Sequence, residues 1–497
     1  MPVSCLPSKY GIGSFGKVAR KWIDFLHEAK QSFWQILPLS PTGFGDSPYQ
    51  SFSAFAGNPY FIELDELRDE GLLEETDYVG IRWYESNNRV DYATLYKHRE
   101  SVLRKAFSRF RDKNKLDEFV KKNEWLNDYG LYMVIKESQG NRSRMEWEEP
   151  LRTRNPDVIE KIIKDKSEDI RYHAFVQYKF YSQWKALKNY SNEKGIQIIG
   201  DIPIYVSMDS ADVWANPELY QLDENNMPIE VSGCPPDSFA EGGQLWGNPL
   251  YDWDKMLESG YIWWIERLRK SFELYDLVRL DHFRGLESYF AIPYGDETAK
   301  RGIWKPGPGK GFIDAIKTAL EDAKIIAEDL GYLTDEVYEL LKYSSYPGMK
   351  LTQYAFDDRE AGDYLPHNYE RNTVVYPGTH DNDTLKGWVK TAPKSCVSDA
   401  MEYTGIYCKR ALPNAMIRLT LQSASSLAVI PMQDWLGLGS KARINTPGAV
   451  GGSNWCWRMN ERDINSKLAK RIADMTSTFG RASNPERYGS INETNKH

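Results

Sequence analysis

A chain of 497 residues with 41% hydrophobic and 27% charged residues has the composition of an ordinary globular protein, and its length allows about two to four domains or one large barrel with insertions. The net charge of −8 argues against a nucleic-acid groove, which needs clustered basic residues. The five cysteines are scattered and form no CxxC pair, and we find no signal peptide or bilayer-spanning apolar run. We therefore expect a cytoplasmic protein without a membrane partner, a disulfide framework or a zinc ribbon.

The first 61 residues are predicted to begin a barrel. Gly16–Ala29 carries apolar residues at helical spacing, and Phe33–Leu39 is typical of a buried strand. A turn-rich segment, 40–50, follows this strand. From residue 62 to residue 194 charged helical segments dominate, so we interpret 62–194 as a mostly helical insertion outside the catalytic body.

Residues 195–478 are predicted to form the remainder of the barrel, with a loop-rich insertion near 205–260. Short apolar runs alternate there with helical patterns, which indicates a parallel sheet. The runs are Gly195–Pro203, Leu277–Asp281, Lys324–Leu330, Met349–Phe356, Thr373–Asp381 and Leu427–Asp434. With Phe33–Leu39 and a short strand near Met1–Val3 the count reaches eight, so we predict a (β/α)₈ TIM barrel. Residues 479–497 are a polar tail.

Carboxylates recur where these runs end. They are Asp201, Asp281, Glu328 with Asp329, Asp381 and Asp434. In a parallel barrel the strand ends share one face, so the acids would gather in one mouth. Such clustering costs stability unless function requires it, which favours an active site. For Asp281 alone, a structural ion pair with Arg279 or Arg284 is the competing interpretation.

Metal and phosphate chemistry are the two rival readings of these residues. His282 and His380 adjoin strand-end aspartates, but no HxH or HExxH spacing is present, and the arginines beside Asp281 disfavour a bound cation. The stretch Lys305–Gly311 lacks the spacing of a phosphate-binding loop. We therefore expect neither a metal nor a cofactor.

Glycosidic chemistry fits the carboxylates better. It needs one ionised carboxylate as nucleophile and one protonated carboxylic acid as proton donor. Asp281, between Arg279 and Arg284, should stay ionised and suits the first role. Glu328 follows an apolar run and adjoins other acids, so its pKa should be raised and it suits the second role. The 16 Trp and 31 Tyr residues add flat faces that suit sugar rings.

At these residues the chain resembles the amylomaltase or disproportionating-enzyme family, the 4-α-glucanotransferases of glycoside hydrolase family 77, which are related to α-amylases. The segments that carry the resemblance span most of the chain in order: Leu6–Gly13, Gly45–Tyr60, Gly200–Val206, Gly233–Asp237, Gly243–Tyr251, Arg279–Gly285, Ala327–Gly331 and Gly378–Asp383.

The resemblance implies roles for individual residues. Asp281 would be the nucleophile, Glu328 the acid/base and Asp381 a third carboxylate that clamps the donor sugar. Lining residues are implied as well: Arg279, His282 and His380 at the donor subsite, Asp237, Gln244 and Trp246 in a loop over the site, and Ser47, Tyr49 and Asn248 near the glucan path.

The sequence departs from the family pattern at two places. Members usually carry an apolar stretch before the Leu6–Gly13 segment, which forms the first barrel strand, whereas this chain begins almost at the end of that stretch. Phe44 stands where some members have Tyr, so a glucan contact made by that hydroxyl would be lost.

The expected reaction is transfer of α-1,4-glucan segments from maltooligosaccharide or glucan donors to glucose or maltodextrin acceptors. Transfer requires that a sugar hydroxyl outcompete water, which favours a covered site. Gly233–Trp253, with its prolines, paired glycines and aromatic residues, has the composition of such a cover. An α-1,4-glucan hydrolase and a non-catalytic glucan-binding barrel remain the alternatives.

Overall fold

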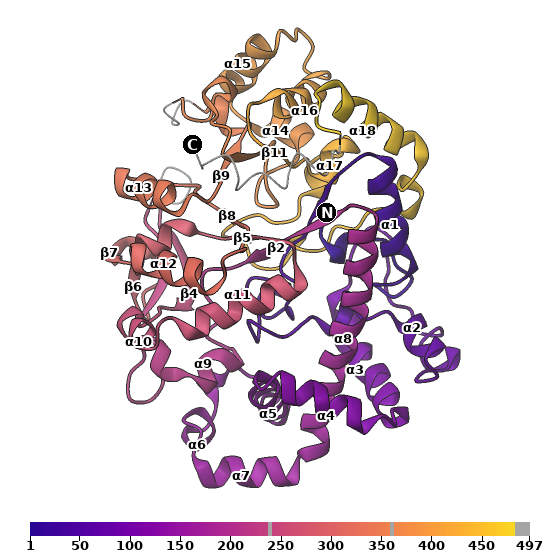
Figure 1. Cartoon of the computed structure of the whole chain (residues 1–497), viewed down its shortest axis with the longest axis vertical. Coiled ribbons are helices and arrows are strands. Elements are labelled where there is room, and N and C mark those ends of the chain that lie inside the picture. Colours follow the sequence, from indigo (N-terminus) through magenta and orange to yellow (C-terminus); the bar gives the residue numbers. More distant parts are fainter. Residues whose placement is uncertain (237–240, 358–361, 483–497) are drawn as a thin grey trace.

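The computed structural model describes residues 1–236, 241–357 and 362–482. Its centre consists of two parallel sheets with short strands (Figure 1). The first sheet contains, in spatial order, β1 (Phe33–Gln35), β2 (Gln197–Ile202), β5 (Leu277–Leu280) and β8 (Ile325–Ala327). The second contains β9 (Gly348–Leu351), β10 (Thr373–Tyr376) and β11 (Leu427–Ala428).

The two sheets share one interior. A single apolar cluster joins Ile199, Leu277 and Ile326 of the first sheet to Met349 and Val374 of the second. Such a filled interior is typical of a barrel whose strands are short and buried. Each of these strands overlaps an apolar run that predicted it, because parallel strands covered on both faces are apolar along their whole length.

The two sheets meet at β8 and β9. The amide of Ala327 donates to the Pro347 carbonyl at 2.9 Å, and the amide of Met349 donates to the Asp329 carboxylate at 2.5 Å. Asp329 is buried, and burial raises its pKa to about 6. An acidic side chain therefore completes the backbone pairing at this junction.

The eighth strand predicted near Met1–Val3 is wrong. Val3–Cys5 forms a turn of 3₁₀ helix instead. The terminal amine of Met1 donates to the Gln35 carbonyl at 3.1 Å, and the Trp34 indole donates to the Met1 carbonyl at 2.7 Å. Met1 thus contacts β1 through its terminal amine and through the Trp34 side chain. These hydrogen bonds are not the regular backbone pairing of a β-strand.

Helices surround the strands, as expected for alternating strands and helices. They are α1 (Lys17–Glu28), α8 (Ser167–Glu193), α11 (Ile262–Leu274), α12 (Gly309–Ala319), α13 (Asp335–Ser344), α14 (Leu385–Thr391), α15 (Lys394–Thr404), α16 (Leu412–Gln422), α17 (Met432–Trp435) and α18 (Ser466–Thr478). Of the predicted polar tail, 483–497 lie outside the described residues.

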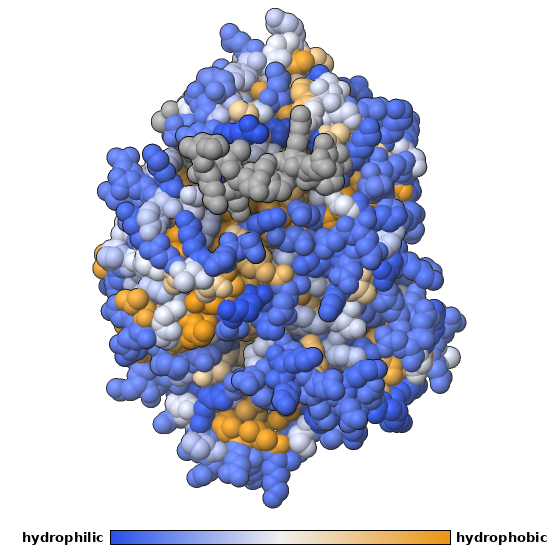
Figure 2. Space-filling view, viewed as in Figure 1, coloured by the Kyte–Doolittle hydropathy of each residue, from blue (hydrophilic) through white to orange (hydrophobic). Residues whose placement is uncertain are grey.

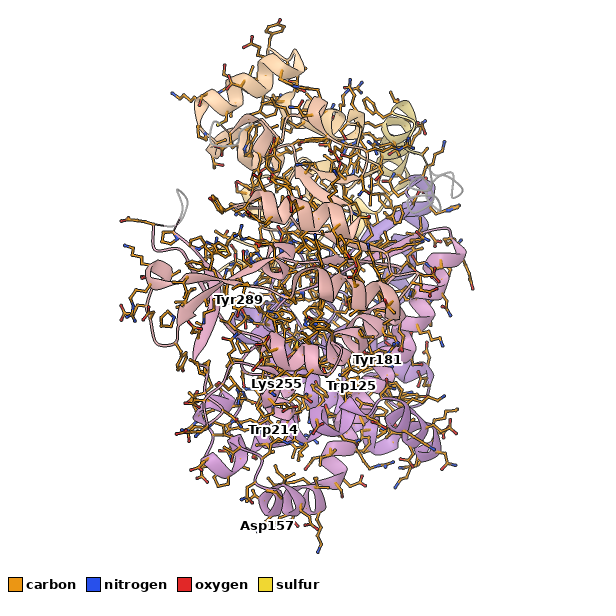
Figure 3. The ribbon with its side chains drawn as sticks, turned by 60° about the vertical axis from the view of Figure 1, so that its left-hand side comes forward. Trp125, Asp157, Tyr181, Trp214, Lys255 and Tyr289 are labelled. Carbon is orange, nitrogen blue, oxygen red and sulfur yellow. The ribbon has the colours of Figure 1, made fainter. Side chains whose placement is uncertain are left out.

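Between residues 62 and 194 the chain is mainly helical. The helices before α8 are α2 (Leu64–Asp69), α3 (Tyr92–Arg109), α4 (Lys113–Lys122), α5 (Trp125–Ser138), α6 (Glu149–Arg152) and α7 (Pro156–Asp165). Trp214 of α9 (Ala211–Ala215), in the loop after β2, packs into a second apolar cluster with residues of α5. In Figure 3 Trp125 and Trp214 lie among the helices below the strands, and Asp157 lies at the lower edge.

A buried polar contact also ties this helical part to the loop after β2. Asp209 accepts hydrogen bonds from the Tyr132 hydroxyl and from the Lys136 ammonium, both at 2.5 Å. The Lys136 side chain is 4% exposed, so loss of Asp209 would leave a buried ammonium without its ion-pair partner.

A separate antiparallel sheet lies beside the barrel. Its strands, in spatial order, are β4 (Gln244–Pro249), β3 (Glu230–Cys234), β6 (Ser288–Pro293) and β7 (Ile303–Pro306). Strands β3 and β4 belong to the segment predicted to be rich in loops, and α10 (Trp253–Glu258) follows them.

The surface is mostly hydrophilic on the face drawn in Figure 2, with hydrophobic patches near the lower edge and at the left. Among the described residues, no helix combines the length and apolar character needed to cross a bilayer.

Gly200 of β2 provides a test of the packing around the barrel. A Cβ at this position would lie 2.1 Å from atoms of the buried Tyr275 ring. We expect Gly200→Ala to lower the free energy of unfolding by about 1–3 kcal/mol, because the ring and strand must move apart. Urea and thermal unfolding measure the loss. Gly80→Ala is the matched control, since nothing lies within 4 Å of its Cβ, and equal stability of the two variants would contradict this packing.

Candidate active site

Arg279 organises the site from the middle of β5. It pairs in register with Asp201 of β2 and with Ile326 of β8. Its Nη1 lies 2.8 and 2.9 Å from the two oxygens of Asp201 and 2.8 Å from Oδ1 of Asp281. The guanidinium is almost fully buried and is therefore shared by two carboxylates.

The two carboxylates differ in exposure. The Asp201 side chain is fully buried, and its Oδ2 also accepts a hydrogen bond from the Tyr49 hydroxyl at 2.7 Å. Burial raises the pKa of Asp201, while Arg279 opposes that effect. The Asp281 side chain is 28% exposed and directly follows β5. Asp281 is consequently the member of the pair that a ligand can reach.

Glu328 follows β8 on the neighbouring strand. Its Oε2 accepts a hydrogen bond from the His282 amide at 2.6 Å, and its Oε1 accepts one from the Leu330 amide at 3.0 Å. The pKa of Glu328 is raised to about 8, chiefly by burial; Arg279 opposes the rise and the charge of Asp281 contributes to it. The carboxyl group therefore holds a proton at neutral pH.

The site thus places two acids in different environments. Asp281 forms an ion pair with Arg279, whereas Glu328 is buried against backbone amides. When two carboxyl groups lie in such different environments, one can act as a charged group while the other acts as a proton donor.

His282 has a left-handed backbone, with φ 55° and ψ 51°. This conformation is uncommon outside glycine and directs the His282 amide to Glu328. The ring packs edge-on against Trp246 at 4.8 Å, and its buried Nε2 has no hydrogen-bond partner within the described chain. Burial lowers the pKa of His282 to about 4, so the ring is neutral. An unpartnered buried nitrogen of this kind is available to a ligand hydroxyl.

Asp381 approaches from the second sheet, after β10. Its Oδ1 accepts a hydrogen bond from the Asn445 side chain at 2.6 Å, and its carbonyl accepts one from Arg443. His380 Nε2 lies 3.4 Å from Asp381 Oδ2, and the His380 ring stacks on Tyr49 with centroids 5.2 Å apart. Because Tyr49 reaches Asp201, a continuous series of contacts connects Asp381 to the Arg279 pair.

The other described residues that were predicted to line the site lie on β4 and on the turn that precedes Tyr49. Trp246 and Gln244 both belong to β4, and the Trp246 indole donates a hydrogen bond to the Gln244 side chain at 3.1 Å. The Trp246 ring lies beside His282. Asn248 is buried and donates to the Val206 carbonyl at 2.8 Å, which ties β4 to the loop after β2. The Ser47 hydroxyl accepts from the Tyr49 amide at 3.2 Å and shapes the turn that presents Tyr49. Asp237 lies outside the described residues.

Arg284 does not hold Asp281, so the expectation that both arginines do so is wrong. Its guanidinium donates to the Tyr332 carbonyl and to the Ser288 hydroxyl, and it lies 3.6 Å from the Trp304 ring centroid. Left-handed His282 turns the chain between Asp281 and Arg284, which directs Arg284 toward the antiparallel sheet.

The strand-end acid Asp434 is hydrogen-bonded to a helix start. It accepts a hydrogen bond from the Leu385 amide at the start of α14 at 2.7 Å. Burial raises the pKa of Asp434 to about 7.

The sequence interpretation missed Asn445 and Arg443. They lie 64 and 62 residues beyond Asp381. They lie in the segment after the run Leu427–Asp434 but not at the end of that run, so position at a strand end does not mark them. Only the tertiary fold brings them to the site.

Among the described residues there is no group of three or more His, Cys, Asp or Glu side chains that could hold a metal ion. The cation between Asp201 and Asp281 is the guanidinium of Arg279.

Comparison with known proteins provides an independent view of these motifs. Residues 1–464 match the family model described as glycoside hydrolase family 77, 4-alpha-glucanotransferase. The 4-alpha-glucanotransferase of Clostridium butyricum is 45% identical, and the alignment covers 97% of this chain and 100% of that protein. The 4-alpha-glucanotransferase of Thermus thermophilus is 43% identical, with 96% and 97% covered.

Solved structures agree with the sequence match. The amylomaltase from Streptococcus agalactiae in complex with acarbose superimposes with a TM-score of 0.94 and 40% identity, covering 97% of this chain and 99% of that one. The amylomaltase of Corynebacterium glutamicum shares the fold at a TM-score of 0.77 with 18% identity, covering 96% and 74%. The predicted barrel fold is thereby confirmed, although its eighth strand is absent from the described residues.

Proposed function

The chain belongs to the 4-alpha-glucanotransferases of glycoside hydrolase family 77, and from that membership we propose that Asp281, Glu328 and Asp381 carry out its transfer reaction. The observation that supports this assignment best is the contrast between Asp281, paired with Arg279, and Glu328, which burial keeps protonated. Transfer by a retaining enzyme needs these two states at once.

In the first step Asp281 attacks the anomeric carbon of the donor sugar. Arg279 binds Oδ1, so Oδ2 is the attacking oxygen in this proposal. The C1–O4 bond breaks as the Asp281–C1 bond forms, and the proton of Glu328 moves to the departing O4. The products of this step are a covalent glycosyl-enzyme and a shortened glucan.

In the second step the 4-hydroxyl of an acceptor sugar attacks the same carbon. Glu328, now ionised, takes the hydroxyl proton, and the bond to Asp281 breaks. Both carboxyl groups return to their starting states, and two inversions leave the α configuration unchanged.

The remaining residues are assigned to sugar binding. Asp381, oriented by Asn445, accepts hydrogen bonds from donor hydroxyls and holds the distorted sugar ring. The free Nε2 of His282 and the imidazole of His380 contact the same sugar. Trp246 and Gln244 belong to the cover that displaces water.

The proposed donors are maltooligosaccharides and α-1,4-glucans, and the proposed acceptors are glucose and maltodextrins. The acarbose complex of the S. agalactiae relative is consistent with a site for α-glucosidic oligosaccharides. We assign the reaction to the cytoplasm, in keeping with five free thiols that are scattered along the chain.

Incubation with maltotriose tests the activity. We expect glucose together with a series of longer maltooligosaccharides, resolved by chromatography. Maltose and glucose without longer products would identify a hydrolase, and an unchanged substrate would identify a non-catalytic binding protein.

The pH dependence of the reaction follows from Glu328. Because burial raises its pKa to about 8, the acid is protonated below that pH and loses its proton above it. We expect kcat/KM for maltotriose to fall by about tenfold per pH unit above this pKa. The control is an α-glucosyl fluoride donor, whose fluoride departs without a proton. An equal alkaline decline in the rate at which this donor forms the glycosyl-enzyme would show that another group titrates.

A further inference from the structure

Tyr332 is an exposed aromatic residue on the loop that carries Glu328. It lies four positions after Glu328, and 70% of its surface is accessible. We propose that the Tyr332 ring is a stacking surface for the acceptor sugar. This inference rests on the function proposed above and goes beyond it by naming an acceptor contact.

The backbone of Tyr332 is fixed although its ring is exposed. The Arg284 guanidinium donates to the Tyr332 carbonyl and lies 5.6 Å from the centre of the Tyr332 ring. Arg284 is itself 3% exposed and lies 3.6 Å from the centre of the Trp304 ring. A buried cation therefore anchors the Tyr332 backbone and lies near its exposed ring.

The chemistry of Glu328 places Tyr332 on the acceptor side. Glu328 protonates the departing O4, which belongs to the sugar beyond the cleaved bond. By microscopic reversibility the acceptor occupies the position of that departing sugar. Tyr332 continues the same loop outward from Glu328, whereas the donor groups Asp381 and His380 come from the second sheet.

A tyrosine ring suits this role. Its flat face packs against the C–H face of a glucose ring, and its hydroxyl can remain in water. Arg284 fixes the adjacent backbone before the acceptor arrives, which reduces the ordering cost of binding.

The test uses α-maltosyl fluoride as donor and glucose as acceptor. We expect Tyr332→Ala to raise the KM for glucose by about fivefold, which corresponds to about 1 kcal/mol. Tyr332→Phe, which keeps the ring, should stay within about twofold of the parent enzyme. The control is Tyr407→Ala, because Tyr407 is 97% exposed on the segment between α15 and α16, which belongs to neither the loop after β5 nor the loop after β8.

A second measurement separates acceptor binding from loop positioning. The first-turnover burst of fluoride release without glucose reports on formation of the glycosyl-enzyme at Asp281, which needs no acceptor, and it should be unchanged in Tyr332→Ala. An unchanged KM for glucose, or a burst that falls together with acceptor use, overturns the inference. A parent enzyme that gives neither burst nor transfer product rejects the proposed function itself, and the inference with it.

Discussion

Replacing Asp281 with asparagine is expected to abolish glucan transfer. The variant keeps the shape of the side chain and removes the charge that forms the bond to C1. Loss of a covalent nucleophile should lower kcat by about 10³–10⁶-fold, or about 4–8 kcal/mol of barrier. Product formation from maltotriose measures the loss.

The fold of this variant should persist, because Arg279 retains both oxygens of Asp201. Far-ultraviolet circular dichroism and the melting temperature check that point. Asp322→Asn, an exposed substitution before β8, is the matched control and should retain full activity. Turnover of Asp281→Asn within a few fold of the parent would refute the nucleophile assignment.

Glu328→Gln is expected to produce a loss that depends on the leaving group. With maltotriose, kcat should fall by about 10²–10⁴-fold, because no proton reaches the departing oxygen. With α-glucosyl fluoride the first step should remain close to that of the parent enzyme, since fluoride needs no proton. A fluoride electrode measures this step.

The second step offers a further check on the same variant. Sodium azide needs no general base, so it should accelerate turnover of Glu328→Gln and yield an α-glycosyl azide. Glu339→Gln, an exposed change on α13, is the matched control. If both donors lose activity equally and azide has no effect, Glu328 is not the acid/base.

The barrel strands could be predicted from the sequence because strands that are buried on both faces appear as continuous apolar runs. Their ends are predicted less well. The run Met349–Phe356 begins inside β9 and extends past its end at Leu351, and Tyr354–Phe356 turns into 3₁₀ helix. Apolar residues continue past the strand into the core, so hydrophobicity alone does not mark where hydrogen bonding stops.

The candidate site could likewise be predicted only in part. The strand-end acids could be predicted because position along the chain fixes position in a barrel. The left-handed turn at His282 could not, because it depends on the Glu328 bond formed by a distant segment. Arg284 was misassigned for that reason, and its contact with Tyr332 depends on the same turn.

The junction between the two parallel sheets determines how the three acids lie relative to one another. Asp281 and Glu328 follow strands of one sheet, whereas Asp381 follows a strand of the other. At β8 and β9 the sheets are joined by the Ala327 amide and the Asp329 carboxylate. The apolar cluster of Ile199, Leu277, Ile326, Met349 and Val374 also spans both sheets. Close-packed side chains of this kind resist relative displacement of the sheets, so the core of the barrel sets the separation between Asp381 and the Arg279 ion pair.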